Sequence, residues 1–237
     1  MARIDTLGNF LTDVASAIKE KKGDSTNIAA EDFDTEIENL PSGGGKYAPR
    51  FISFAYYEGT NLDYELANLD ISNLTSMKRM FSGNSNLLSS NINNYINNWD
   101  TSKITNMQNM FSYDTSLVSL DLSNWDTSSV TNFGCMFDNC TSLTTLDLSG
   151  FDISNASGTV TTYGISNMFN KCTSLTTLDI SNFEFTSLAS SIAKDAVFGN
   201  NSNNGPADNC LIYVKNQAQV DWLAIYYPRL TNVQIKS

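Results

Sequence analysis

Histidine is missing from this chain of 237 residues, and basic residues are few, with 14 lysines and arginines against 25 aspartates and glutamates. Without histidine the usual general base of enzyme active sites is lacking, so we expect no catalytic activity and no cofactor. The net charge of −11 is not offset by any basic patch. That charge argues against binding to nucleic acid or to an anionic membrane. The sequence also has no apolar run near 18 residues, so we expect no membrane-spanning helix.

Cysteine is scarce too, and its spacing argues against a metal site. The four cysteines are Cys135, Cys140, Cys172 and Cys210. They form no C-x-x-C pair, and no histidine completes a zinc site, so we expect no bound metal. Cys140 and Cys172 follow the same Met-Phe phrase, which predicts buried free thiols stacked in neighbouring units. A disulfide between these two is the alternative, because stacked positions approach the allowed Cα separation.

A repeated phrase is the main positive signal. Ser-Leu-x-x-Leu-Asp-Leu-Ser-Asn and its variants begin at Ser116, Ser142 and Ser174, and a Met-Phe pair lies between the copies. Trp99 and Trp125 are 26 residues apart, and other intervals are lengthened by insertions at residues 91–95 and 156–163. A period in this range predicts a solenoid, and we expect both insertions to form loops on one side of the stack.

Each unit reads as a short strand followed by a short helix, which makes an α/β repeat. The alternate leucines of Leu-x-x-Leu-x-Leu face the core, and the aspartates between them face outward. The stretch around Ile104, Met107, Met110 and Phe111 has helical spacing, and the Asp-Thr-Ser before it suits a helix N-cap. We expect Asp100, Asp126 and Asp152 to be such caps. The aromatic column at Trp99, Trp125, Phe151 and Phe183 is predicted to be core.

These phrases closely resemble BspA-like (bacterial surface protein A-type) leucine-rich repeats over residues 66–209. The resemblance implies a solenoid of about five coils and an extracellular binding or adhesion role. The first coil, at residues 69–81, is expected to be abbreviated, as at a solenoid end, because residues 69–73 lead straight into Leu74 without a Trp-Asp-Thr-Ser segment. Residues 210–237 predict a βαβ-like cap, with a helix at residues 216–226 that has Val220, Leu223 and Ile225 as its apolar positions.

The N-terminal region lies outside the repeat. Residues 1–40 predict two short helices, followed by a Gly-rich hinge and lead-in strand at residues 41–65. Residues 4–40 resemble a helical element of phage tail, baseplate and fibre proteins. That resemblance implies docking to other virion proteins or to copies of this chain, hence a homo-oligomer. The candidate docking residues are Phe10, Leu11, Val14, Ile18, Phe33 and Ile37.

Candidate ligand-binding residues come from the insertions and from one acidic column. The strand aspartates Asp121, Asp147 and Asp179 predict either a ligand-facing or cation-binding stripe or a solvated sheet surface. The remaining candidates are the insertion residues and a tyrosine outside the repeat register: Asn91, Asn93, Asn94, Tyr95, Tyr163 and Tyr113. Asparagine and tyrosine suit hydroxyl-rich ligands such as a host glycan, and the alternative is ordinary loop solvation.

Together these features predict a phage virion structural protein, in a fibre, tail or head appendage, that attaches to a host surface glycan or protein. We expect no signal peptide, because the N-terminal residues begin an amphipathic segment. An exported adhesin normally carries such a signal, whereas lysis releases a virion protein. The alternatives are a bacterial cell-surface adhesin of the same repeat type and a virion spacer that binds no ligand.

Overall fold

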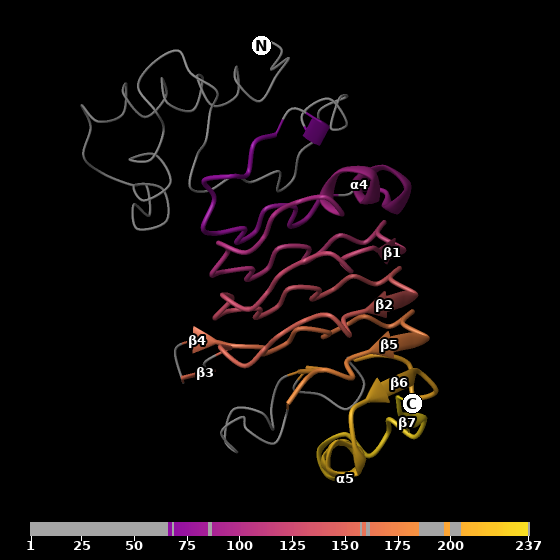
Figure 1. The fold of residues 1–237 in the computed structure, drawn as a ribbon. Helices are drawn as coiled ribbons and strands as arrows, with labels where there is room; N and C mark the ends of the chain where they lie inside the picture. Colours follow the sequence, from indigo (N-terminus) through magenta and orange to yellow (C-terminus); the bar gives the residue numbers. More distant parts are fainter. Residues whose placement is uncertain are drawn as a thin grey trace, which may run out of the picture.

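The structure, a computed structural model, describes residues 66–67, 69–84, 87–156, 158–159, 162–184, 197–199 and 205–236. Within them lies an open sheet of five parallel strands in the order β1-β2-β5-β6-β7 (Figure 1). The strands are β1 (Ser119–Leu120), β2 (Thr145–Asp147), β5 (Thr177–Asp179), β6 (Leu211–Val214) and β7 (Val233–Ile235). The predicted docking residues Phe10, Leu11, Val14, Ile18, Phe33 and Ile37, and the predicted hinge, lie outside the described residues.

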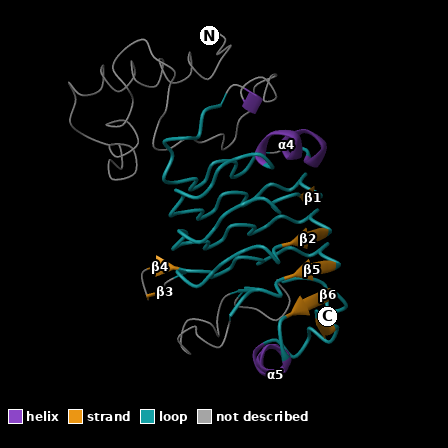
Figure 2. Cartoon of the chain, in the orientation of Figure 1, coloured by secondary structure: helices purple, strands orange, loops and turns teal. Residues whose placement is uncertain are grey.

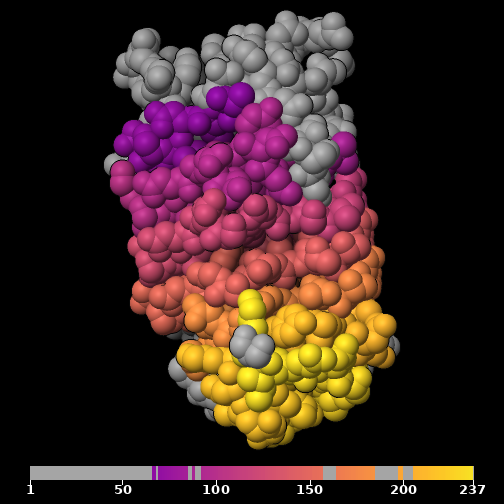
Figure 3. Space-filling model, turned by 45° about the vertical axis from the view of Figure 1, so that its right-hand side comes forward, coloured from indigo at the N-terminus to yellow at the C-terminus, as the bar shows by residue number. Residues whose placement is uncertain are grey.

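The register of the sheet places equivalent residues of successive repeat units opposite each other. Leu120 pairs with Leu146, which pairs with Leu178, and Ile212 follows in β6. All four side chains are buried, so the predicted inward direction of the leucines is confirmed. Figure 3 shows the successive units as bands that run across one continuous surface.

The other side of each unit is not helical. Between Met77 and Gly83, alternate backbone N–H groups donate to the next unit, as from Met77 to the Asn106 carbonyl (2.8 Å) and from Phe81 to the Met110 carbonyl (2.9 Å). A helix needs those N–H groups for its own ladder, so the predicted helix around residues 104–111 is wrong. The segment consists of turns instead (Figure 2), although Met107, Met110 and Phe111 are buried as expected.

Two backbone positions in each unit lie in the left-handed region. The first position is occupied by Arg79, Asn109, Cys135 and Asn167 (φ 55–58°), and the second by Gly83, Tyr113, Asn139 and Lys171 (φ 58–73°). Each left-handed residue reverses the chain between two tight turns. Such a φ costs a residue with a Cβ about 1–2 kcal/mol relative to glycine. Half of these positions hold glycine or asparagine, which tolerate this φ, whereas Tyr113, like Arg79, Cys135 and Lys171, does not belong to that group.

Replacing Tyr113 with glycine should raise the free energy of unfolding by about 0.5–1 kcal/mol, because glycine adopts this φ without strain. Urea unfolding followed by circular dichroism measures the change. The matched control is Thr145→Gly in strand β2, where glycine should lower the free energy of unfolding. A loss of stability in the Tyr113 variant would show that its ring contributes more packing than the backbone strain costs.

A ladder of phenylalanine rings forms the centre of the core. Phe81, Phe111, Phe137, Phe169 and Phe198 stack in sequence, with ring centroids 5.5, 5.8, 6.0 and 5.6 Å apart. The predicted aromatic core column is also confirmed, because Trp99, Trp125, Phe151 and Phe183 are all buried. Trp125 donates its indole N–H to the Ile96 carbonyl at 2.9 Å. The five ladder rings and Trp125 therefore contribute to the contacts between units.

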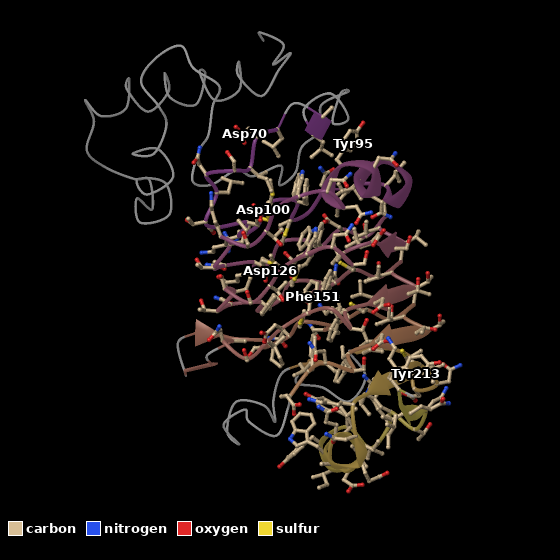
Figure 4. All side chains as sticks on the ribbon, in the orientation of Figure 1. Asp70, Tyr95, Asp100, Asp126, Phe151 and Tyr213 are labelled. Atoms are coloured by element: carbon tan, nitrogen blue, oxygen red, sulfur yellow. The ribbon has the colours of Figure 1, made fainter. Side chains whose placement is uncertain are left out.

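The first described unit is in a different register from the one predicted. Asp70 accepts the Ser72 backbone N–H (3.0 Å), as Asp100 accepts that of Ser102 (3.1 Å). Asp70, Asp100 and Asp126 lie in one column (Figure 4). Residues 69–72 are therefore the counterpart of the Trp-Asp-Thr-Ser segment. The prediction that this segment is missing from the first unit is wrong, since an apolar Leu69 replaces tryptophan and hides the match.

The two insertions are ordered elements on opposite sides of the stack (Figure 1). The first forms helix α4 (Ser89–Ile96), which packs beside β1. The second forms a hairpin of β3 (Gly158–Thr159) and antiparallel β4 (Thr162–Tyr163). The expectation of loops on one side is wrong, because the first insertion replaces the strand of its unit and the second extends the turn opposite.

The predicted βαβ cap is confirmed at the C-terminal end. Helix α5 (Gln217–Tyr226) lies between β6 and β7, which pair in parallel. Asn216 caps α5 by accepting the Gln219 N–H at 3.2 Å. The predicted apolar face is only partly right, because Ile225 is 70% exposed while the polar Gln219 is buried. In the part of the chain described here, no helix combines the length and apolarity that crossing a membrane requires.

Candidate binding surface

The strand aspartates hold the turns that follow each strand. Asp121, Asp147 and Asp179 accept the backbone N–H of the serine two residues later, at 3.2, 2.9 and 3.0 Å. An aspartate in this position closes an Asx turn. No three potential metal-ligating side chains come together within the described ranges. This geometry accounts for the recurrence of aspartate without a ligand.

Asp179 differs from the other two because it is buried and paired. It lies opposite Asp147 in the sheet and forms an ion pair with Lys236, which follows β7. Burial alone raises the pKa of the Asp179 carboxyl, but hydrogen bonds from Lys236 and Ser181 outweigh it and bring the pKa below its usual value. The acidic column is therefore partly neutralised by the C-terminal cap.

The second acidic column also serves the backbone. Ser102 donates its N–H and its hydroxyl to Asp100, and Ser128 does the same to Asp126. The serine hydroxyl bond is the main cause that lowers the pKa of both carboxyls. Asp152 accepts the Ser154 N–H at 2.8 Å. The predicted capping role is right in its hydrogen bonds, although the capped segments are turns and not helices.

Threonines join neighbouring units at three corners. The hydroxyl of Thr105 donates to the Thr75 carbonyl and that of Thr131 to the Thr105 carbonyl, each at 3.1 Å. On the sheet side, Thr144 bonds Val118 and Thr176 bonds Thr144 in the same way. Thr101 and Thr127 bond the carbonyls of Asp126 and Asp152 at the third corner. The recurring threonines thus bond neighbouring units to each other.

The thiols are structural as well. All four cysteines are free, so the alternative of a Cys140–Cys172 disulfide is excluded in this structure. Cys140 donates its S–H to the Phe111 carbonyl (3.0 Å), and Cys172 donates to the Phe137 carbonyl (3.1 Å). Burial raises the pKa of Cys135 to about 11 and that of Cys210 to about 12. These thiols stay protonated near neutral pH and are poor nucleophiles.

Helix α4 brings several predicted ligand residues to one place. Asn93 accepts the Asp121 backbone N–H at 3.0 Å and so covers the edge of β1. Tyr95 is half-buried against the core, and Asn94 is exposed. Figure 4 shows Tyr95 on α4, at the margin of the stack. One side of this helix therefore satisfies the sheet edge while the other faces solvent.

Two apolar residues beside α4 are exposed. Leu88 is 48% exposed and Val118 is 47% exposed. They occupy the same place in adjacent units, where later units have Thr144 and Thr176. We call Leu88, Asn94, Tyr95, Val118 and Asp121 the α4 corner. It combines apolar, aromatic, amide and carboxylate groups at the only place in the described sheet where a helix replaces a strand.

A comparison with known protein families identifies the family of this chain. The family described as "Mycoplasma protein of unknown function, DUF285" matches residues 51–163 and, in an overlapping second placement, residues 85–205. The chain belongs to this family. DUF285 is in the group related to BspA-like leucine-rich repeats. Neither the curated proteins nor the solved structures gave a match.

The DUF285 matches include both insertions and end before the cap. Of the predicted ligand residues, the α4 corner gathers Asn94, Tyr95 and Asp121, with Asn93 beneath them. Tyr113 is 50% exposed at a left-handed turn, and Asp147 and Asp179 lie further along the sheet. The side chains of Asn91 and Tyr163 lie outside the described residues. The sequence reasoning missed Leu88 and Val118, although an apolar residue at a position that later units fill with threonine was the available signal.

Proposed function

We propose that this DUF285 chain is a leucine-rich-repeat solenoid that serves as an attachment module of a phage virion and binds a host-surface glycan through the α4 corner. The parallel sheet, the ring ladder and the hydrogen bonds between units support a rigid scaffold. The family match supports a repeat protein. The virion setting rests on the resemblance of the N-terminal residues to phage tail, baseplate and fibre proteins.

One observation carries the choice of the α4 corner. The recurring aspartates, serines and threonines are engaged in turns or between units, whereas Leu88 and Val118 expose apolar surface beside α4, the helix that carries Asn94 and Tyr95. Sugar rings present apolar C–H faces together with hydroxyls, which suit apolar or aromatic side chains beside an amide. A net charge of −11 also disfavours a polyanionic ligand.

Binding of the labelled full-length chain to candidate host cells tests this function. The double variant Leu88→Ser, Asn94→Ala should bind at least about tenfold more weakly, a loss of about 1.4 kcal/mol. The control is Asp221→Ala on the exposed side of α5, which should bind as the wild type does. Periodate treatment of the cells should abolish binding, and protease treatment should not.

The other outcomes separate the alternatives. Loss of binding after protease treatment alone would identify a host protein as the receptor. If the Leu88→Ser, Asn94→Ala double variant binds as strongly as the Asp221→Ala control, the α4 corner is not the binding site. If no host cell binds the chain, the virion spacer replaces this proposal. Mass spectrometry of purified virions and of proteins shaved from bacterial surfaces decides between the phage protein and the bacterial adhesin.

A further inference from the structure

One buried carboxyl in the stack has no role in the proposed attachment. Asp114 has no exposed surface, and no hydrogen-bond partner reaches its Oδ2 atom. Its Oδ1 atom accepts the Asn84 backbone N–H at 2.7 Å, and the nearby Gly83 backbone N–H donates to the Ser112 carbonyl at 2.7 Å. A buried charge with one unsatisfied oxygen is costly in a protein interior. The arrangement therefore favours the neutral acid.

The neighbouring units show what this position requires. Cys140 and Cys172 fill the same place as Asp114, and each donates its S–H to the phenylalanine carbonyl of the preceding unit. In those units the phenylalanine carbonyl accepts both this S–H and a backbone N–H. The equivalent acceptor for Asp114 is the carbonyl of Phe81, which already accepts the Asn84 N–H at 3.1 Å. An ionised carboxylate there would place two acceptors against each other, whereas a carboxylic acid supplies the donor.

We propose that Asp114 is a neutral carboxylic acid whose Oδ2–H donates to the Phe81 carbonyl, so that joining its unit to the preceding one takes up a proton from solvent. The junction between these units then becomes more stable as the pH falls. The contact between the units of Phe81 and Asp114, next to the unit that carries α4, is therefore stabilised at low pH.

The electrostatics of the site agree with this geometry. Burial raises the pKa of Asp114 to about 9, against the lowering effect of the Asn84 and Gly83 backbone groups. No charged side chain among the described residues contributes to that shift. The titratable group facing Asp114 from the next unit is Cys140, whose own pKa is raised by burial. Asp138, beyond Cys140, also has a pKa raised by burial.

The sign of the pH dependence follows from proton binding. Between pH 4 and pH 9 the folded chain holds one proton at Asp114 that the unfolded chain, with an ordinary aspartate pKa of 3.8, has released. The unfolding equilibrium constant should therefore rise by up to about tenfold per pH unit across this range. From pH 5 to 8 all four thiols stay mainly protonated in both states, and the carboxyls with a lowered pKa stay mainly ionised in both.

Urea unfolding of the full chain from pH 5 to 8, followed by the fluorescence of buried Trp99 and Trp125, tests the proposal. Asp114→Asn and Asp114→Cys should each reduce the number of protons taken up on folding by about one. Both variants keep a donor for the Phe81 carbonyl, and neither new side chain titrates in the folded chain between pH 5 and 8. Asp138→Asn and Asp100→Asn are the controls, and both should keep the part of the pH dependence of unfolding that comes from Asp114. An unchanged slope in both Asp114 variants would overturn the proposal.

A direct measurement covers the case in which the variants fail to fold. Carbon-13 NMR of aspartate-labelled wild-type chain should show one carboxyl that stays protonated at pH 7. Infrared spectroscopy should show the matching carboxylic acid band, with exchange in heavy water too slow for a surface group. If all carboxyls are ionised at pH 7, Asp114 is not a neutral acid, and its protonation does not stabilise the contact between the two units.

Discussion

Replacing Phe137 with alanine should lower the free energy of unfolding by about 3–5 kcal/mol. Phe137 is fully buried, and its ring stacks on Phe111 at 5.8 Å and on Phe169 at 6.0 Å, with interplanar angles of 2° and 3°. Removing the ring opens a cavity that faces two neighbouring units at once. Because stacked repeats depend on nearest-neighbour contacts, both contacts weaken together. Urea unfolding followed by circular dichroism measures the loss.

Phe137→Leu is the matched control, since it keeps most of the volume and should cost less than about 1.5 kcal/mol. The difference between the two variants then reports the cavity and not the loss of the aromatic ring. A loss below about 1 kcal/mol in the alanine variant would mean that the ring ladder does not hold the units together.

Replacing Gln219 with alanine should lower the free energy of unfolding by about 2–4 kcal/mol, because a buried carbonyl and a partly buried N–H lose the bonds that Gln219 makes. Gln219 has no exposed surface. Its amide donates to the Phe183 carbonyl, and its Oε1 accepts the Lys215 backbone N–H at 2.7 Å. One side chain therefore connects helix α5 to the repeat unit that contains β5 and to the residue after β6.

The control for Gln219 is Gln217→Ala on the exposed side of the same helix, with an expected change within about 0.5 kcal/mol. Gln217 bonds Asp221 on the surface, where such a contact contributes little. Hydrogen exchange should show faster exchange in α5 and β7 of the Gln219 variant than in β1 and β2. Uniform acceleration throughout the sheet would contradict a local role in attaching the cap.

The leucine and aromatic columns were predictable because their physics is local and repeated. Period-two leucines predict an inward face, and Leu146 and Leu148 follow it. The phase of the Met-Phe phrase predicts the ring ladder, since residues in equivalent positions must meet when units stack. The βαβ order of the cap followed from the apolar pattern of residues 210–237.

The turn side could not be predicted from the same periodicity. Residues three and four apart also face inward in consecutive tight turns, so helical spacing does not distinguish a helix from such turns. The deciding groups are backbone N–H atoms that bond the next unit, as that of Tyr113 does to Asp138. The buried amide of Gln219 was missed for a related reason, because its partners belong to distant segments and a polar residue reads as exposed.

The sequence marked the insertion at residues 91–95 as a candidate site but did not predict the structure of that insertion. Its asparagines suggested a loop, whereas the segment forms helix α4, because the bond that covers the β1 edge comes from the distant Asp121. The exposure of Leu88 and Val118 depends on how adjacent units align, which the composition of one unit does not reveal. The spacing after the Met-Phe phrase shows in the sequence that Asp114 fills the position of Cys140 and Cys172, whereas its unsatisfied oxygen depends on atomic positions.

The threonine bonds have a consequence for how this chain can change over generations. The Thr131 hydroxyl donates to the Thr105 carbonyl in the same way that the Thr105 hydroxyl donates to the Thr75 carbonyl. Each unit therefore offers the next unit the same kind of carbonyl acceptor that it finds in the unit before it. Duplication or loss of one whole 26-residue segment, the interval from Met110 to Met136, would leave matching partners at the new junction. Copying errors that are whole multiples of the repeat would therefore alter the reach of the stack and preserve its fold.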